Sequence, residues 1–259
     1  MAYLEPAILL LTHLANTMKI NDKLSIGLIL FILIGAFFTS HVPFDSRLSL
    51  VSSASMFLFA FPSFYYIAKT AGFKKGVLAI IVLSIFALSI ETIAIKTGFP
   101  YGEFIYMDKL GYKLFGITPW TVPLAWVPLV LGSMTIAQRF SKHLFGQVVI
   151  STFLLVVIDL VLDPGAVAMD FWKYTQPSVY YGVPLSNFLG WIFSGFIGSI
   201  LLYIFLRTIT LPWKTVFSYF LILLFWTNIA MWKGLWIPFS IGFISLFLLS
   251  YYSFCKKIW

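Results

Sequence analysis

Long apolar runs broken by short polar segments dominate this chain. Most runs have about 20 residues, the length that an α-helix needs to cross the hydrocarbon core of a bilayer. Only Lys233 and Gly234 separate the last two runs, so seven helices are an alternative to eight. The pattern predicts an all-α, polytopic transmembrane helix bundle of about eight spans, at residues 24–40, 48–67, 76–97, 117–138, 145–163, 186–207, 213–232 and 234–254.

The composition indicates the same class of protein. Hydrophobic residues make up 61% of the 259 residues and charged residues only 10%, whereas about a quarter of an ordinary soluble domain is charged. The net charge of +8 would point to nucleic acid in a soluble protein, but here the basic residues fall between the apolar runs. We therefore expect a lipid bilayer and no nucleic acid as a partner, a single transmembrane domain over residues 1–259, and a location in the cell membrane.

The basic residues also predict an orientation. With the N-terminus in the cytoplasm, eleven of the 17 Lys and Arg residues fall on the cytoplasmic side. Cytoplasmic loops are enriched in these residues, so we expect both termini in the cytoplasm. The mixed N-terminal 23 residues are expected on the membrane surface. The two longest loops, at about 98–116 and 164–185, then lie together on the outer side.

One apolar run contains a lone carboxylate, Glu91, close to its end. Gly98 and Pro100 are expected to stop this helix, and a Gly-rich turn then brings a second carboxylate, Glu103. A charge inside hydrocarbon is costly, so an acid at this depth usually has a function. The structural alternatives are that Glu91 pairs with Lys96 or with a backbone amide, and that Glu103 is simply solvated in its loop.

A second acidic motif lies at the end of another run. Asp159 and Asp163 are four residues apart and therefore share one face of a helix. Two carboxylates so close do not readily ionise together, so one can act as a general acid and the other as a general base. Alternatively, Asp163 caps the helix end before Pro164, and Asp159 forms a hydrogen bond to a neighbouring helix.

The alternating direction of the helices places the polar residues of several runs at one depth. Glu91, Glu103, Asp159, Asp163 and Asn187 all fall near the outer boundary. Asn187 is predicted to bind water or orient a carboxylate, or else to bridge two helices. Many aromatic residues lie nearby, most of them suited to an interfacial belt, and a few able to stabilise a cation in a cavity. The aromatic candidates for substrate contact are Tyr101, Trp120, Trp126 and Trp191.

Other kinds of site are not indicated. His13, His41 and His143 are scattered, and Cys255 is the single cysteine, so we expect no metal site. Asp45, Asp108 and Asp170 are expected to be solvated loop charges. The chain has no Asp-rich motif for a magnesium–diphosphate complex, no phosphate-binding Gly-rich loop and no dinucleotide fingerprint, so we expect no cofactor.

Four blocks of the sequence carry a family resemblance. The stretch Thr97-Gly-Phe-Pro-Tyr-Gly-Glu-Phe104 resembles the signature of the integral-membrane carotenoid biosynthesis family, which includes carotenoid hydratases of the bisanhydrobacterioruberin hydratase type. Residues 110–126, 159–164 and 181–191 resemble three further blocks of that family. In order and spacing, the resemblance covers roughly residues 85–195.

The resemblance implies a cofactor-independent hydro-lyase that adds water to the terminal double bond of a linear carotenoid. Protonation of such an alkene at its less substituted carbon gives a tertiary carbocation, which water captures as a tertiary alcohol. Our reasoning on the residues, rather than the resemblance, assigns the roles. We expect Asp159 or Glu91 to donate the proton, and Asp163 and Asn187 to hold the water.

Three other functions are considered. A carotenoid cyclase would form the same cation but quench it with an internal double bond; polar groups that hold water favour hydration instead. An ion-coupled carrier would place its acids near the midplane of two matching halves, and the sequence shows no such repeat. A non-catalytic carotenoid-binding protein would need no acid. The chain length of the carotenoid and the oligomeric state are left open.

Overall fold

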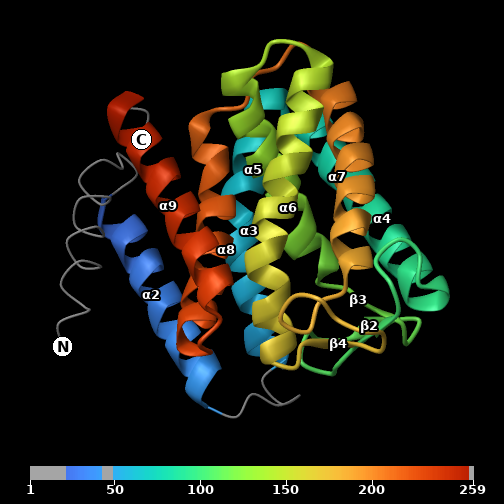
Figure 1. Cartoon of the computed structure of the whole chain (residues 1–259). Coiled ribbons are helices and arrows are strands. Elements are labelled where there is room, and N and C mark those ends of the chain that lie inside the picture. The colour runs from blue at the N-terminus through green and yellow to red at the C-terminus, as the bar shows by residue number, and fades with distance from the viewer. Residues whose placement is uncertain (1–21, 43–48, 257–259) are drawn as a thin grey trace.

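The computed structural model describes residues 22–42 and 49–256. Eight helices account for most of this part of the chain, and each overlaps a predicted span (Figure 1). The N-terminal segment expected on the membrane surface lies almost wholly outside the described residues, as does Asp45. In chain order the helices are α2 (Asp22–His41), α3 (Ser49–Ala71), α4 (Phe73–Thr97), α5 (Val122–Phe140), α6 (Leu144–Ala168), α7 (Leu185–Leu206), α8 (Val216–Trp232) and α9 (Trp236–Lys256).

The prediction of an all-α, multi-pass membrane bundle is confirmed. Among the described helices, six are long and apolar enough to cross a membrane: α3, α4, α6, α7, α9, and α8 together with the 3₁₀ turn Trp213–Thr215 that precedes it. α2 and α5 run alongside them (Figure 1). α8 and α9 are separate helices, because Gly234 turns the chain with a φ of 67°, which glycine adopts without strain.

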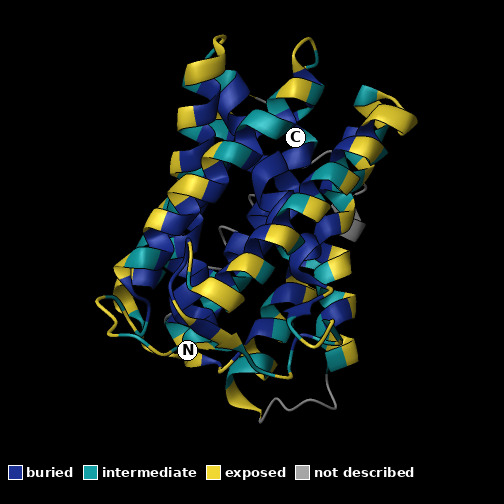
Figure 2. Cartoon of the chain, turned by 90° about the vertical axis from the view of Figure 1, so that its right-hand side faces the viewer, coloured by how far each residue is buried: buried dark blue, intermediate teal, exposed yellow. Residues whose placement is uncertain are grey.

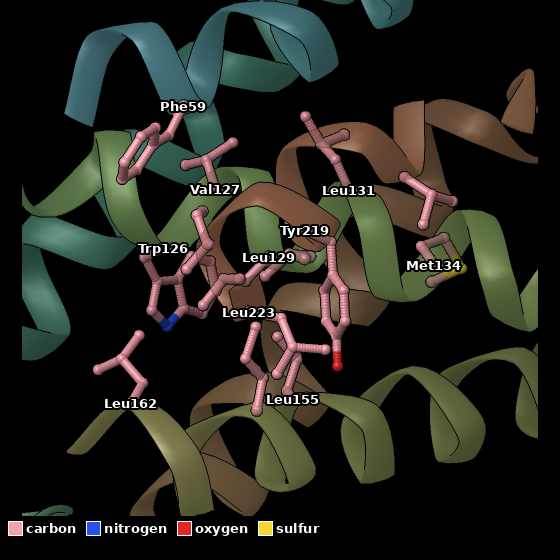
Figure 3. Packing of buried hydrophobic residues seen from close by; sticks show 14 of the residues in the cluster. Phe59, Trp126, Val127, Leu129, Leu131, Met134, Leu155, Leu162, Tyr219 and Leu223 are labelled. Carbon is pink, nitrogen blue, oxygen red and sulfur yellow. The ribbon is translucent and has the colours of Figure 1, made fainter. Parts of the chain in front are cut away.

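α5 is the central helix of the bundle. α3, α4, α6, α7 and α8 pack against it, and nearly all of its residues are buried. Figure 3 shows part of this core, where Trp126 and Leu129 of α5 lie close to Tyr219 and Leu223 of α8. Figure 2 shows the complementary pattern, with the exposed residues on the outer faces of the bundle. The most buried helix, α5, is therefore surrounded by other helices and not by lipid.

The two long loops lie together at one end of the bundle, as the alternating helix direction predicts (Figure 1). The end of α9 lies toward the opposite end (Figure 1). The loops form two short antiparallel sheets that the helical pattern did not predict: β1 (Phe104–Tyr106) pairs with β4 (Trp172–Tyr174), and β2 (Lys113–Leu114) pairs with β3 (Thr118–Pro119). The assignment of this end to the outer side stays a prediction.

α4 ends where the sequence predicts. Its last residue is Thr97, and Gly98 follows with a φ of 77° and donates its N–H to the carbonyl oxygen of Ala94. This left-handed glycine is the usual way for a helix to end. The turn that follows leads into β1, so the helix end sets the position of the first strand.

The sequence predicted that α6 ends at residue 163, and this prediction was wrong. The helix continues through Pro164 to Ala168. Proline has no N–H, so the carbonyl of Leu160 loses its helical partner. The hydroxyl of Tyr180 donates to that carbonyl oxygen at 3.1 Å, which compensates for the loss inside the bundle. Asp163 therefore lies within a helix and does not cap its end.

The close approach of α5 and α8 gives a test of the packing. A Cβ added at Gly132 would overlap the Cβ of Tyr219, so we expect Gly132→Ala to destabilise the protein by about 1–3 kcal/mol through overpacking. The measurement is thermal unfolding of the purified protein in detergent. Gly27→Ala in α2 is the control, because an added Cβ there meets no atom within 4 Å. Equal unfolding temperatures for the two variants would contradict this packing.

Candidate functional site

A cavity of about 420 Å³ lies in the half of the bundle that carries the two long loops. Its lining is mainly apolar and aromatic, and it includes residues from seven of the eight helices, α2 to α8. Among the lining residues, three have carboxyl or carboxamide side chains: Glu91 from α4, Asp163 from α6 and Asn187 from α7. The structure thus brings together polar residues that are far apart in the sequence.

Asn187 links the two aspartates of α6. Its Nδ2 donates to Asp159 Oδ2 at 2.9 Å and to Asp163 Oδ2 at 2.7 Å. This geometry confirms that the two aspartates share one helix face, and that Asn187 bridges two helices while it orients carboxyl groups. Asp159 is fully buried and does not line the cavity, so it lies behind Asp163 and Asn187.

Two tyrosines from the paired strands hold the acids from the loop side. Tyr106 of β1 donates to Glu91 Oε2 at 3.0 Å, and Tyr174 of β4 donates to Asp163 Oδ2 at 2.7 Å. Strand side chains alternate between two faces, so Phe104, Tyr106, Trp172 and Tyr174 all face the cavity, which they line. The pairing of β1 with β4 therefore positions both hydroxyl donors at once.

Both of these hydroxyl groups are held in their protonated form. Burial raises the pKa of Tyr106 and of Tyr174 well above the usual range of a phenol, and the nearby carboxyl groups, Glu91 for Tyr106 and Asp163 for Tyr174, raise it further. A phenol that keeps its proton can only donate to a carboxylate. The two tyrosines therefore donate to the acids whenever the acids are ionised.

The three carboxyl groups have no cationic partner in the described part of the chain. Glu91 interacts electrostatically with Asp163 and with Asp159, but within residues 22–42 and 49–256 no salt bridge joins any of the three to Lys or Arg, and Lys96 is exposed. Within the described ranges, no three His, Cys, Asp or Glu side chains converge enough to hold a metal ion. Three negative charges buried without compensation would be very unfavourable, so we expect the cluster to retain a proton.

The predicted aromatic contacts divide into two groups. Tyr101, Trp126 and Trp191 are buried and line the cavity. Trp120 is 42% exposed and lies outside the lining. Glu103 is also exposed and outside the lining; its Oε2 accepts a hydrogen bond from Thr175 Oγ1 at 3.2 Å. The structure therefore does not bring Trp120 or Glu103 to the acidic cluster.

Two other acids are loop charges, as predicted. Asp108 forms a salt bridge with Lys113 at 2.7 Å, and Asp170 forms one with Lys173 at 3.0 Å. The hydrogen bond and the charge of Lys113 lower the pKa of Asp108. Both aspartates are well exposed, so these pairs contribute little to stability.

Tyr106 and Tyr174, the hydroxyl partners of Glu91 and Asp163, are residues that the sequence analysis did not select. Each belongs to a three-residue segment in which two aromatic residues flank one other residue, Phe-Ile-Tyr at 104–106 and Trp-Lys-Tyr at 172–174. This alternation is the signal of a strand with one apolar face. Because both segments are short and lie inside long loops, the pattern becomes informative only once the two loops are known to pair.

The bridge made by Asn187 gives a testable prediction. Asn187→Ala removes the donor to two buried carboxyl oxygens, and one unsatisfied buried acceptor costs about 1–3 kcal/mol, so we expect a loss of stability of about that size. The control is Asn228→Ala, since the amide of Asn228 donates only to the Leu224 carbonyl of its own helix. The measurement is thermal unfolding in detergent, and an equal effect of the two substitutions would show that the bridge is not important for stability.

Comparison with known proteins connects this arrangement to a family. The family described as carotenoid biosynthesis protein matches residues 46–249, which extends beyond the four blocks of the sequence on both sides. The chain is also 33% identical over 183 residues to the bisanhydrobacterioruberin hydratase of Haloarcula japonica, an alignment that covers 65% of this chain and 61% of the relative. The chain thus spans about three fifths of the length of that relative. No solved structure matches the chain. Since the family match covers well over half of the chain, this protein belongs to the carotenoid biosynthesis protein family.

Proposed function

We propose that this protein is a carotenoid hydratase, a hydro-lyase that adds water to the terminal double bond of an acyclic carotenoid end group. The observation that carries the proposal is an apolar, aromatic cavity into which Glu91 and Asp163 project without a cationic partner. Family membership indicates the class of substrate, and the relative named a hydratase indicates the reaction. We place the protein in the cell membrane, where a linear carotenoid and the bilayer are both available.

Glu91 is the proton donor in this proposal. It lines the cavity, whereas Asp159, the other candidate, does not. Tyr106 occupies Oε2 of Glu91, so Oε1 is the oxygen that can present a proton to the substrate. The proton bonds to the less substituted carbon of the alkene, and the electron pair of the double bond forms the new C–H bond. The positive charge then lies on the more substituted, tertiary carbon.

Aromatic side chains around the acids can stabilise this cation. Tyr101, Trp126, Trp172 and Trp191 line the same cavity as Glu91 and Asp163. A cation near an aromatic face is favoured by about 0.5–2 kcal/mol, more when water is excluded. The negative charge left on Glu91 after proton transfer acts in the same direction, because opposite charges attract strongly in a medium of low dielectric constant.

Asp163 and Asn187 complete the reaction by positioning water. The oxygen of the water forms a bond to the tertiary carbon, and a proton of the water passes to the Asp163 carboxylate. Asp163 gains a proton and Glu91 has lost one, so the number of protons in the cluster is unchanged, and transfer of a proton from Asp163 back to Glu91 restores the starting state. Nothing is oxidised or reduced, and the proposed reaction therefore calls for no redox cofactor. Asp159, held by the same amide of Asn187, is a positioning residue.

The test is expression in a lycopene-producing host with mass analysis of the pigments. We expect the wild-type protein to add the mass of one water per modified end. Glu91→Gln and Asp163→Asn should each lower the yield of product by about 10²-fold or more, the usual contribution of an acid or base that acts in the transition state. Protein amounts and thermal unfolding of each variant are measured in parallel, so that loss of folding is separated from loss of chemistry.

Two carboxyl groups outside the cavity provide controls. Asp170→Asn and Glu103→Gln remove exposed carboxylates and are expected to give wild-type yields. Pigment of unchanged mass but altered absorption would mean that the cation is quenched internally, as in a cyclase. Unchanged pigment with a folded wild-type protein would contradict an enzymatic role on this substrate.

A further inference from the structure

The two helices that begin the described chain are consecutive in sequence but are not packed together. α2 packs along α8, whereas α3 packs on α4, α5 and α8. No comparable contact joins α2 to α3 within the described residues. Figure 1 shows α2 at the edge of the bundle, beside α8. The arrangement leaves a space with α2 on one side, α3 on the other and α8 behind.

The cavity that contains the acids continues into this space. Its lining includes Phe31, Ile34 and Phe38 of α2, and Val51 and Met56 of α3. The back wall comes from α8, with Ile222, Phe225 and Trp226. One continuous cavity therefore leads from Glu91 and Asp163 to the gap between α2 and α3.

The outer end of the cavity is an apolar opening. Phe31, Ile34, Phe38 and Val51 are 48%, 55%, 55% and 55% exposed, respectively. Phe31 lies ten residues before His41, the end of α2, which corresponds to about 15 Å along the helix. Phe38 and Val51 lie within one turn of the ends of their helices. We therefore expect the opening to extend from the membrane boundary into the hydrocarbon core, which is about 30 Å thick, and its deeper part to face lipid tails.

Contacts with α8 hold α2 in place on the side away from the opening. The ring of Phe37 is in edge contact with Trp232, with the centroids 5.4 Å apart. Lys233 Nζ, in the turn after α8, donates to the carbonyl oxygen of Ser40 at 2.8 Å. Ile29 and Ala36 of α2 are buried and do not line the cavity. The position of α2 is thus set by α8, and the gap beside α3 does not depend on packing across it.

We propose that this gap is a lateral opening through which a linear polyene enters from the bilayer, with its end group at Glu91 and Asp163 and the adjoining part of its chain between α2 and α3. The inference rests on the proposed function for the identity of the end group. Cavities of about 300–1,000 Å³ enclose a drug-sized ligand, so 420 Å³ holds one end of a long polyene and leaves the rest in lipid. The site therefore recognises the end group and does not measure the full chain length.

Gly35 allows the opening to be blocked without disturbing the packing. It lines the cavity, and an added Cβ there meets no atom within 4 Å. Gly35→Trp therefore fills the gap with a ring. The matched control is Gly27→Trp, in the same helix, where an added Cβ also meets nothing within 4 Å and the residue does not line the cavity.

Two quantities are measured for each protein expressed with lycopene: the pigment that co-purifies per mole of protein, and the hydrated product. We expect Gly35→Trp to lower both by at least about tenfold, which corresponds to about 1.4 kcal/mol of binding free energy, and Gly27→Trp to match the wild type. Wild-type amounts of bound pigment and product with Gly35→Trp would overturn the proposal.

A reversible block provides a second variant. In a Cys255→Ser background, which removes the single native cysteine, Ile34→Cys and Ser55→Cys place thiols on the two sides of the opening. We expect a bifunctional, disulfide-containing cross-linker to stop pigment uptake and a reductant to restore it. Full uptake by the cross-linked protein would overturn the proposed opening.

The two proposals can fail separately. Pigment that binds to the wild type without hydration, but is lost from Gly35→Trp, would refute the hydratase and support the opening. If no pigment binds to the wild type, both proposals are refuted.

Discussion

The arrangement of this protein depends on how three carboxyl groups are accommodated inside an apolar bundle. Glu91, Asp159 and Asp163 are buried, and the hydrogen bonds that hold them come from Asn187, Tyr106 and Tyr174. These donors are neutral, so they satisfy oxygen atoms without supplying positive charge. Burying a polar group is costly unless its hydrogen bonds are made. One oxygen of each acid has such a donor, whereas Oδ1 of Asp159 has no partner among the described residues. Because no cation neutralises these acids, we expect the cluster to remain a source of protons.

The fold places this cluster where both lipid and loop residues can reach it. Glu91 and Asp163 lie within two turns of the ends of α4 and α6, next to the loops that form β1 and β4. The loops supply the tyrosine donors, and the same cavity reaches the gap between α2 and α3. A substrate that dissolves in lipid and a reaction that consumes water both require a site of this kind at the boundary.

The sequence predicted the helices well because their apolar runs are long and are interrupted by clear signals. Gly98 ends α4 as expected, and the i, i+4 spacing correctly placed Asp159 and Asp163 on one face. Helix direction alone brought Glu91, Asp163 and Asn187 to one level. The end of α6 was missed because the donor that compensates for Pro164 is Tyr180, which lies in the next loop. Local sequence contains no information about a partner so far along the chain.

The details of the site required tertiary structure for the same reason. In sequence context, Glu103 and Trp120 resembled Tyr101 and Trp126. Strand pairing and helix packing nevertheless left Glu103 and Trp120 facing outward, whereas Tyr101 and Trp126 face the cavity. Tyr106 and Tyr174 became partners of the acids only through the antiparallel register of β1 and β4. The gap beside α2 exists because α2 and α3 are not packed together. A hydrophobic pattern predicts which face of a helix is buried, but it does not predict which neighbour covers that face.

The most direct test of the central claim is infrared difference spectroscopy of the protein in bilayers at neutral pH. It detects the carbonyl stretch of a protonated carboxylic acid separately from ionised carboxylates. If the cluster stores a proton, the wild type shows a carboxylic acid band that is lost or shifted in Glu91→Gln and Asp163→Asn, and unchanged in Glu103→Gln. A wild-type spectrum without such a band, or a band that neither cluster substitution alters, would contradict this account.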